Sequence, residues 1–369
     1  MPHNITRGGV IVFTFLLLTA CSSPPAPAVV ANIPATAAPT FTPTATLTTA
    51  PTATPTPTAT PIPTNTPTPT PLPNPLNVEW MRQQSYPGSD LTIERELAAG
   101  PNYRQYVASY QSDGNTNFGL LAIPTGEKPA AGWPAIIFNH GYIPPEIYST
   151  TDSYSSHVRS LARSGYVVFK PDYRGHDNSE GEPRGGYGAP NYTIDVLNAV
   201  AAVKSLPEVD DNRLGMFGHS MGGHITLRSM VTTGNIKAGV IWAGVVASYP
   251  DLLNNWRRPI PASIPPQAIR WRETFVEENG TPEENPEFWA SISPIAYVAD
   301  ISGPLQLHHG TNDADVPLEF SDSLDQAMQD AGKTVEYYVY NGDNHNLLNN
   351  WGTVMRRTIE FFDQHVKGE

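Results

Sequence analysis

Cysteine is almost absent from this chain, whose 369 residues contain one, at position 21. A single thiol excludes disulfides within the chain and any metal cluster built from cysteines. No HExxH or similar histidine pair is present, so the sequence offers no zinc site of that kind. Positive charge is also scarce, with 22 Lys and Arg against 35 Asp and Glu and a net charge of −13. The basic footprint of a nucleic-acid-binding protein is therefore missing.

Charge of either sign is absent from a long N-terminal stretch. Between Arg7 and Glu79 the chain contains no Asp, Glu, Lys or Arg. Its first part holds an apolar run, Val10 to Leu18, which is shorter than the roughly 20 residues that span a bilayer. A basic start, a short apolar run and small residues before a break are typical of a secretory signal. We therefore interpret residues 1–20 as a signal peptide.

The one cysteine lies where that signal would end. The segment Leu18-Thr19-Ala20-Cys21 resembles the bacterial lipobox, in which the cysteine becomes the acylated first residue of a mature lipoprotein. This resemblance implies that Cys21 carries lipid and anchors the protein to the cell membrane, on the extracytoplasmic side, without a spanning helix. An ordinary secretory signal followed by a chance cysteine is the alternative.

Proline dominates the residues that follow. Residues 22–76 contain 16 of the 38 prolines, interleaved mostly with Thr and Ala. Such a segment has too few large apolar side chains to bury a core, so we expect residues 21–76 to form an extended, disordered spacer. The spacer would hold the rest of the chain away from a membrane or through a wall layer. A glycosylated stalk is the alternative.

Residues 77–369 have the pattern of one folded domain in which apolar strands alternate with helices. The expected strands are 91–98, 103–110, 118–124, 135–138, 166–170, 214–218, 238–243, 305–308 and 335–340. The expected helices are about 151–163, 192–205, 221 onward, 318–331 and 347–365. This alternation predicts an α/β fold with a mostly parallel twisted sheet, helices on both faces and an antiparallel N-terminal edge.

One segment interrupts the alternation. About fifty residues, 249–300, are rich in proline and large aromatic side chains and are too long for an ordinary connection, so we expect a small helical lid. Its aromatic and basic side chains either line a substrate pocket or form the lid's own core and rim. These side chains are Trp256, Arg257, Arg258, Trp271, Phe275 and Trp289.

A G-x-S-x-G pentapeptide, Gly218-His219-Ser220-Met221-Gly222, lies between an expected strand and an expected helix. A serine in that context occupies a strained turn that presents its hydroxyl above the sheet, and the glycines let strand and helix approach closely. Ser220 is therefore the candidate nucleophile. A glycine-rich turn without chemistry is the alternative.

A serine hydroxyl needs a base and an orienting carboxylate, which in hydrolases of this architecture follow the serine in the order acid, then histidine. His345 is the candidate base, because it lies in a loop between the last strand and the last helix. Asp313 and Asp315 both follow the strand 305–308 and compete for the role of acid. The remaining histidines after the serine fall on helices or at a strand end: His224, His308, His309 and His365.

The developing oxyanion needs N–H donors. The segment Phe138-Asn139-His140-Gly141-Tyr142 ends a strand where such a loop is expected. Tyr142 would offer its backbone N–H or its hydroxyl, and Met221, the residue after the nucleophile, would offer a second N–H. Tyr142 as a plain pocket wall is the alternative.

Four motifs together resemble the α/β-hydrolase superfamily, and within it the catalytic domain of the prolyl oligopeptidase family. They are Asn139-His140-Gly141-Tyr142, Pro171-Asp172-Tyr173-Arg174-Gly175-His176, Gly218-His219-Ser220-Met221-Gly222-Gly223 and His309-Gly310-Thr311-Asn312-Asp313. The resemblance runs from about Leu120 to the C-terminus and implies Ser220 as nucleophile, Asp313 as acid and His345 as base. It also implies a serine peptidase acting on peptide or aminoacyl bonds, without metal or cofactor.

The chain departs from that family in three places. The larger peptidases carry an N-terminal β-propeller, where this chain has the spacer and a few strands. The acidic pair that grips a peptide amino terminus in the dipeptidyl branch has no match, and Asp177 stands where related hydrolases often have glycine. A carboxylesterase of small acyl esters is therefore the close alternative, and a module that binds without cleaving is a third. The expected partners are a small peptide or ester substrate and the membrane, but no nucleic acid.

Overall fold

The computed structural model describes residues 74–256 and 270–368. The expected signal peptide, Cys21 and the spacer as far as residue 73 lie outside the described residues, as do Arg257 and Arg258. No helix in the described ranges is both long enough and apolar enough to cross a bilayer.

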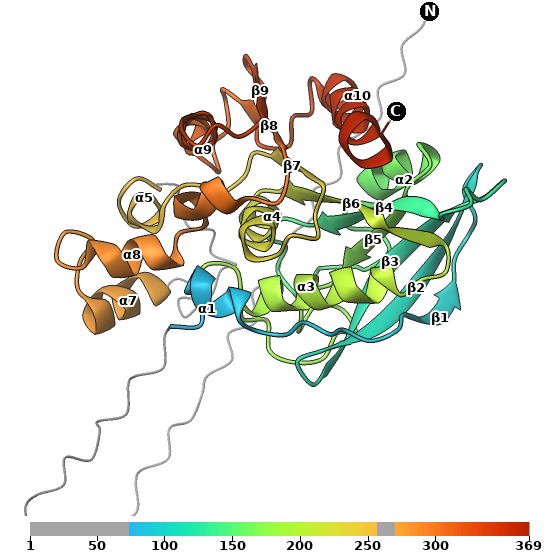
Figure 1. Cartoon of the computed structure of the whole chain (residues 1–369), viewed down its shortest axis with the longest axis horizontal. Helices are drawn as coiled ribbons and strands as arrows, with labels where there is room; N and C mark the ends of the chain where they lie inside the picture. Colours follow the sequence, from blue (N-terminus) through green and yellow to red (C-terminus); the bar gives the residue numbers. More distant parts are fainter. Residues whose placement is uncertain (1–73, 257–269, 369) are drawn as a thin grey trace, which may run out of the picture. The chain divides into compact units, whose positions relative to one another are not determined.

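A nine-stranded sheet, in the order β1-β2-β3-β5-β4-β6-β7-β8-β9, forms the centre of the described part (Figure 1). Antiparallel pairing joins β1, β2, β3 and β5, and every pair from β5 to β9 is parallel. The strands are β1 Thr92–Glu96, β2 Tyr103–Ser112, β3 Asn115–Pro124, β4 Trp133–Asn139, β5 Val167–Pro171, β6 Val209–His219, β7 Ala238–Trp242, β8 Leu305–Gly310 and β9 Val335–Tyr340. The predicted mostly parallel sheet with an antiparallel N-terminal edge is confirmed.

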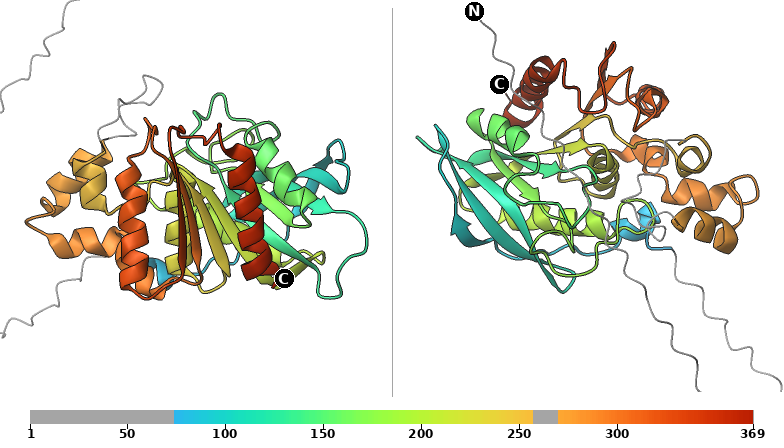
Figure 2. Two further views of the ribbon diagram at one scale, coloured as in Figure 1. Left: turned by 90° about the horizontal axis from the view of Figure 1, so that it is seen from above. Right: turned by 180° about the vertical axis from the view of Figure 1, so that it is seen from behind.

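Helices cover both faces of the sheet (Figures 1 and 2). Side chains alternate across a strand, so Ile137 on β4 joins the core under α3, α4 and α9, whereas Ile136 and Phe138 join the core under α2 and α10. The helices are α2 Ser155–Arg163, α3 Asn191–Lys204, α4 Met221–Thr232, α9 Leu318–Asp330 and α10 Trp351–Phe362, the last continued by a π turn, Asp363–Lys367. A further helix, α1, Val78–Arg82, was not among those expected from the sequence; the side chain of Asn77 caps it.

The segment expected to form a lid is helical in its described part. It contains α5 Tyr249–Asn254, α7 Trp271–Asn279, α8 Pro286–Ile292 and a 3-10 turn, Pro294–Asp300. Phe275 and Trp289 pack with Tyr249 and Leu76 in a separate apolar cluster. These two aromatic side chains therefore form the segment's own core.

A buried arginine joins this cluster to the helix that follows the nucleophile. Arg228 on α4 is fully buried, and its guanidinium donates to the carbonyl oxygens of Leu76 and Ile292, both at 2.6 Å, and to Tyr249 Oη at 3.3 Å. Burial lowers the pKa of Arg228. No carboxylate among the described residues pairs with it, so uncharged groups compensate the charge: these oxygens, the sulfur of Met81 at 3.8 Å and the ring of Tyr249. Removing the guanidinium would leave buried carbonyl groups without partners.

Candidate active site

Ser220 stands at a sharp turn between β6 and α4. It precedes the first residue of α4 and has φ 56° and ψ −119°, a conformation that side-chain-bearing residues rarely adopt. A Cβ on Gly222 would lie 2.0 Å from the carbonyl oxygen of Asn139, and one on Gly218 would lie 2.3 Å from the carbonyl oxygen of Gly222. The two glycines therefore let the strand, the helix and the loop after β4 close around Ser220, as the pentapeptide predicts.

His345 and Asp313 meet from two different loops. Asp313 follows β8, His345 lies between β9 and α10, and His345 Nδ1 is 2.8 Å from Asp313 Oδ2. The other carboxylate oxygen, Oδ1, accepts the backbone N–H groups of Asp315 at 2.8 Å and Val316 at 2.9 Å. With Nδ1–H donating to Asp313, the Nε2 atom of His345 is left as the proton acceptor.

A second histidine also contacts this carboxylate. His309 Nε2 lies 3.0 Å from Asp313 Oδ2, and Ser321 Oγ lies 2.7 Å from His309 Nδ1. Burial raises the pKa of Asp313, but the hydrogen bonds from His309 and His345 outweigh it and hold the pKa well below the ordinary value. From the sequence, His309 was expected only at the end of a strand. Its place four positions before Asp313, in the same motif, was the available signal.

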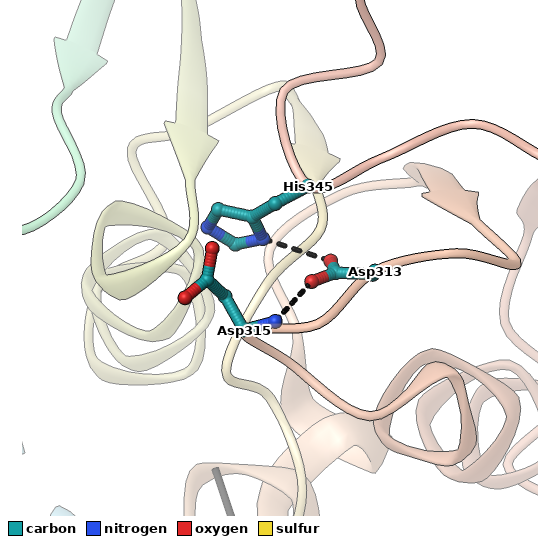
Figure 3. A group of neighbouring side chains, drawn as sticks. All are labelled: Asp313, Asp315 and His345. Carbon is teal, nitrogen blue, oxygen red and sulfur yellow. Dashed lines mark hydrogen bonds and ion pairs between the residues drawn. The ribbon is translucent and has the colours of Figure 1, made fainter. Parts of the chain in front are cut away.

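Asp315 also lies beside His345. Figure 3 shows its carboxylate on the side of the imidazole away from Asp313. Asp315 does not cap the next helix, because α9 begins at Leu318 and its N-cap is Pro317. Among the described residues, ligand atoms of Asp313, Asp315 and His345 lie within 4.8 Å of one another, close enough to hold a metal ion. The oxygens of Asp313, however, already accept hydrogen bonds from four N–H groups.

The loop after β4 lies against the nucleophile. A Cβ on Gly141 would be 3.1 Å from Ser220 Cβ, and β4 pairs with β6 up to Asn139 opposite Gly218. The N–H of Gly141 donates to Tyr154 Oη at 3.1 Å, so this amide already has a partner within the protein. Met221 is the first residue of α4, and a helix leaves its first amides without partners inside the helix.

Tyr154 and His219 link the three loops of the site, and neither residue was a candidate from the sequence. Tyr154 Oη lies 2.6 Å from His219 Nδ1, and His219 Nε2 lies 3.0 Å from the carbonyl oxygen of His345. Burial lowers the pKa of His219 well below its usual value, so the ring is neutral. Tyr154 therefore donates to Nδ1, and Nε2–H donates to His345. His219 lies inside the pentapeptide, but only the fold brings Tyr154 to it.

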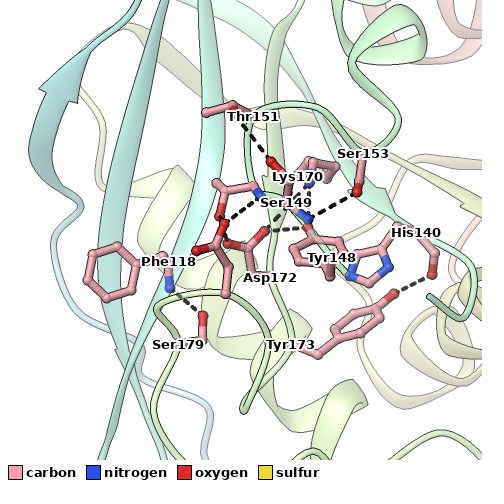
Figure 4. A network of polar contacts seen from close by, with 12 residues as sticks. Phe118, His140, Tyr148, Ser149, Thr151, Ser153, Lys170, Asp172, Tyr173 and Ser179 are labelled. Atoms are coloured by element: carbon pink, nitrogen blue, oxygen red, sulfur yellow. Dashed lines mark hydrogen bonds and ion pairs between the residues drawn. The ribbon is translucent and has the colours of Figure 1, made fainter. Parts of the chain in front are cut away.

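A buried polar network lies behind the loop after β4 (Figure 4). Lys170 Nζ and Asp172 Oδ1 are 3.6 Å apart, with both side chains fully buried, and Tyr148 Oη hydrogen bonds to both groups. The Tyr148 ring stacks on His140 with centroids 4.5 Å apart. Tyr173 stacks on the same imidazole at 4.1 Å and donates its hydroxyl to the His140 carbonyl oxygen at 2.8 Å. These contacts hold the start of the loop in place.

Asp177, which stands where related hydrolases often have glycine, adopts φ 49°. A positive φ suits glycine, which explains that preference. Here the aspartate Oδ2 accepts the backbone N–H of Thr150 at 2.8 Å and its hydroxyl at 2.9 Å. The side chain thus holds the segment that leads into α2.

A cavity of about 970 Å³ opens over the site. Ser220, His345, Gly141 and Tyr142 line it, together with the polar face of α2. The described aromatic side chains of the lid segment do not line this cavity. Instead, the indole N–H of Trp256 donates to the carbonyl oxygen of Asp315 at 2.8 Å.

A mostly parallel sheet with a serine elbow, a histidine and an aspartate on the loops after its strands defines a serine hydrolase of the α/β-hydrolase fold. A sequence profile of the prolyl oligopeptidase family (Peptidase_S9) matches residues 152–369, more than half of the chain. The chain belongs to the prolyl oligopeptidase family.

Two relatives come from Bacillus subtilis strain 168. The uncharacterized peptidase YuxL is 28% identical over 288 residues, which are 75% of this chain and 41% of YuxL. The uncharacterized peptidase YtmA is 27% identical over 261 residues, which are 69% of this chain and 92% of YtmA. The chain therefore spans about two fifths of the length of one relative and about nine tenths of the other.

Solved structures of both peptidases and esterases share the fold. The acylaminoacyl peptidase of Pyrococcus horikoshii superimposes with a TM-score of 0.57 at 23% identity, over 73% of this chain and 43% of that one. An acetyl xylan esterase from Paenibacillus sp. R4 superimposes with a TM-score of 0.58 at 18% identity, over 77% of this chain and 92% of that one. At these identities the likeness shows the fold.

Proposed function

We propose that this protein is an extracytoplasmic, lipid-anchored serine peptidase that cleaves peptide or aminoacyl bonds through an acyl-enzyme. The observation that carries the proposal is the hydrogen bond of His345 to Asp313 in a site where His345 and Ser220 line the same cavity. Membership of a peptidase family supports peptides as substrates.

The proposed reaction has two steps. Ser220 Oγ attacks the acyl carbon while His345 Nε2 takes its proton, and Asp313 holds the imidazolium that forms. The N–H groups of Met221 and Tyr142 would stabilise the oxyanion. His345 then gives the proton to the leaving amine, and water repeats the attack on the acyl-enzyme to release the acid and restore Ser220.

Carboxylesterase activity is the second candidate, and the cavity supplies the reason to keep it. Asp152 is the only carboxylate among the described residues that line the cavity. No pair of acids is there to hold the ammonium group of a free peptide amino terminus. Substrates with a blocked acyl end, amide or ester, therefore suit the site better than free dipeptides.

The substrate class is tested with the full chain purified in mild detergent. Free aminoacyl anilides, N-acylated peptide anilides and short-chain aryl esters are compared, with Ser220→Ala as the background. We expect cleavage of N-acylated anilides that depends on Ser220. Ester turnover with inert amides would show a carboxylesterase, and no Ser220-dependent turnover of any substrate would favour a binding module.

The anchor is a separate part of the proposal and rests on the lipobox-like segment that ends at Cys21. When a bacterial host expresses the full chain, the protein is expected in the detergent phase of a phase-partition experiment. Cys21→Ser should move it to the aqueous phase, because the acyl chains supply the membrane affinity. An unchanged distribution would refute lipidation at Cys21.

A further inference from the structure

The polar face of α2 forms one wall of the cavity that holds Ser220. Val158, Leu161 and Ala162 turn toward the sheet and are buried, while Arg159 and Arg163 line the cavity. The two arginines are four positions apart, so they project from the same side of the helix, one turn from each other. The wall of the candidate active site thus presents two guanidinium groups in a row.

Neither arginine has an ionic partner in the described parts of the chain. Arg163 donates to Ser160 Oγ at 3.3 Å, a neutral partner. Several other surface arginines pair with carboxylates, as Arg104 does with Glu96 at 2.6 Å and Arg356 with Glu360 at 2.8 Å. Two like charges four residues apart on a helix destabilise it slightly. Acidic residues outnumber basic ones in this chain, 35 to 22, so the absence of an acidic partner among the described residues is notable. Arg163 lies in the last turn of α2, where the helix dipole favours a positive charge, but helix stability does not account for Arg159 in the middle of the helix.

The first turn of α2 is anchored beside the nucleophile. Tyr154, which directly precedes the helix, hydrogen bonds to His219 and to the N–H of Gly141. From there the helix rises about 1.5 Å per residue, which places Arg159 about 6 Å and Arg163 about 12 Å along the axis from Ser155. An extended peptide advances about 3.3 Å per residue, so a peptide that ran along α2 from Ser220 would pass Arg159 and Arg163 about two and four residues from the scissile bond.

The cavity continues past Arg163. A second cavity of about 320 Å³ shares Ser160, Arg163 and Trp351 with the first and runs between α2 and α10, which lie side by side in Figures 1 and 2. The first cavity, about 970 Å³, is at the upper end of the range for small-molecule sites. Two adjoining cavities of these volumes have room for a substrate of several residues.

We propose that the two adjoining cavities along α2 form a substrate-binding channel in which Arg159 and Arg163 select peptides with a carboxylate two to four residues from the bond that Ser220 attacks. Arginine suits this task, because its planar fork binds a carboxylate through two parallel hydrogen bonds. The inference rests on the proposed function, since it assumes that the substrate enters at Ser220. To that function it adds a preference for substrates with an acidic side chain.

The test compares peptides that differ only in Glu or Gln, with the exchange placed at successive positions on each side of the scissile bond. For the full chain in detergent, kcat/KM is expected to be about 5-fold higher for Glu than for Gln at each of two positions, the effect of one exposed ion pair, mainly through KM. Arg159→Gln should remove the preference at the position nearer the scissile bond and Arg163→Gln the preference at the farther one, and the double variant should remove both while still cleaving the Gln peptide. Raising the salt concentration to 0.5 M should weaken the preference in the parent protein.

Arg356→Gln is the matched control, because Arg356 lines the second cavity but is paired with Glu360. The preference of this variant for Glu over Gln peptides should be the same as that of the parent protein. If the parent protein cleaves Glu and Gln peptides equally, or if the double variant keeps the preference, the inference is overturned while the proposed function stands.

A binding measurement separates the inference from catalysis. Calorimetry with the Ser220→Ala protein should show tighter binding of the Glu peptide than of the Gln peptide, and adding Arg159→Gln and Arg163→Gln should abolish the difference. If no peptide is cleaved but this difference is found, the peptidase proposal fails, and the inferred carboxylate-binding role of Arg159 and Arg163 stands. Equal binding of both peptides would overturn that role itself.

Discussion

Asp313→Asn is expected to lower kcat by about 10⁴-fold while KM changes little. The carboxylate accepts Nδ1–H of His345 at 2.8 Å and so keeps Nε2 as the base. An asparagine can turn its NH₂ group toward Nδ1, which would place the imidazole proton on Nε2 and leave no acceptor for the Ser220 proton. Steady-state kinetics on the best substrate from the panel measures the loss, and circular dichroism verifies folding. A loss below about 10-fold would show that Asp313 is not the acid.

Asp315→Asn is the matched control for this prediction. Both aspartates lie within reach of His345, but Nδ1 hydrogen bonds to Asp313 and the carboxylate of Asp315 lies on the other side of the ring. We expect Asp315→Asn to change kcat by less than about 10-fold, the size of effect that one nearby charge exerts on a partly exposed group. If instead Asp315→Asn has the large effect and Asp313→Asn the small one, the assignment of the two aspartates is reversed.

The free energy of unfolding is expected to fall steeply as the pH drops from 6.5 toward 5. Six histidines among the described residues have a pKa that burial lowers; for His308 it lowers the value to about 3 and for His157 to about 4. They are His140, His157, His176, His219, His224 and His308. Below their ordinary pKa of 6.5, the unfolded chain binds a proton at each histidine and the native state does not, so acid favours unfolding. Full stability is therefore present above pH 6.5.

The size of this effect follows from the fully buried His308. Between pH 6.5 and 5 this one residue removes about 2 kcal/mol, and the other five act in the same direction. The sum is a large part of the roughly 5–15 kcal/mol that stabilises a typical domain. Urea unfolding at pH 7.5, 6.5, 5.5 and 5.0 measures the dependence on pH.

Two variants test whether the buried histidines cause the pH dependence of the free energy of unfolding. His308 contacts Tyr340 Oη at 2.9 Å and Gln306 Oε1 at 2.7 Å, and His308→Gln offers polar atoms to the same partners without a titrating group. His308→Gln should remove about 2 kcal/mol of the loss between pH 6.5 and 5. His365→Gln, at a partly exposed position near the C-terminus, should not change the slope. A parent protein with constant stability from pH 7 to pH 5 would contradict the prediction.

The sequence by itself determined the features that depend on neighbouring residues. Apolar runs and helical spacing identify strands and helices locally, so the α/β alternation and the elements on either side of Ser220 could be predicted. The positive φ of Ser220 and the close approach allowed by Gly218 and Gly222 also follow from one pentapeptide. The family could be recognised for the same reason, because each of its motifs is a short continuous segment.

Only the tertiary structure decided which distant side chains meet. His309 as a second donor to Asp313, the link from Tyr154 to His219 and the place of Asp315 beside His345 depend on how loops after different strands converge. Likewise, Phe275 and Trp289 proved to be the core of the lid segment, while the wall of the cavity came from α2. Composition reveals which side chains are polar or apolar, but contacts between residues tens or hundreds of positions apart arise from the packing of whole elements. A linear pattern does not contain that information.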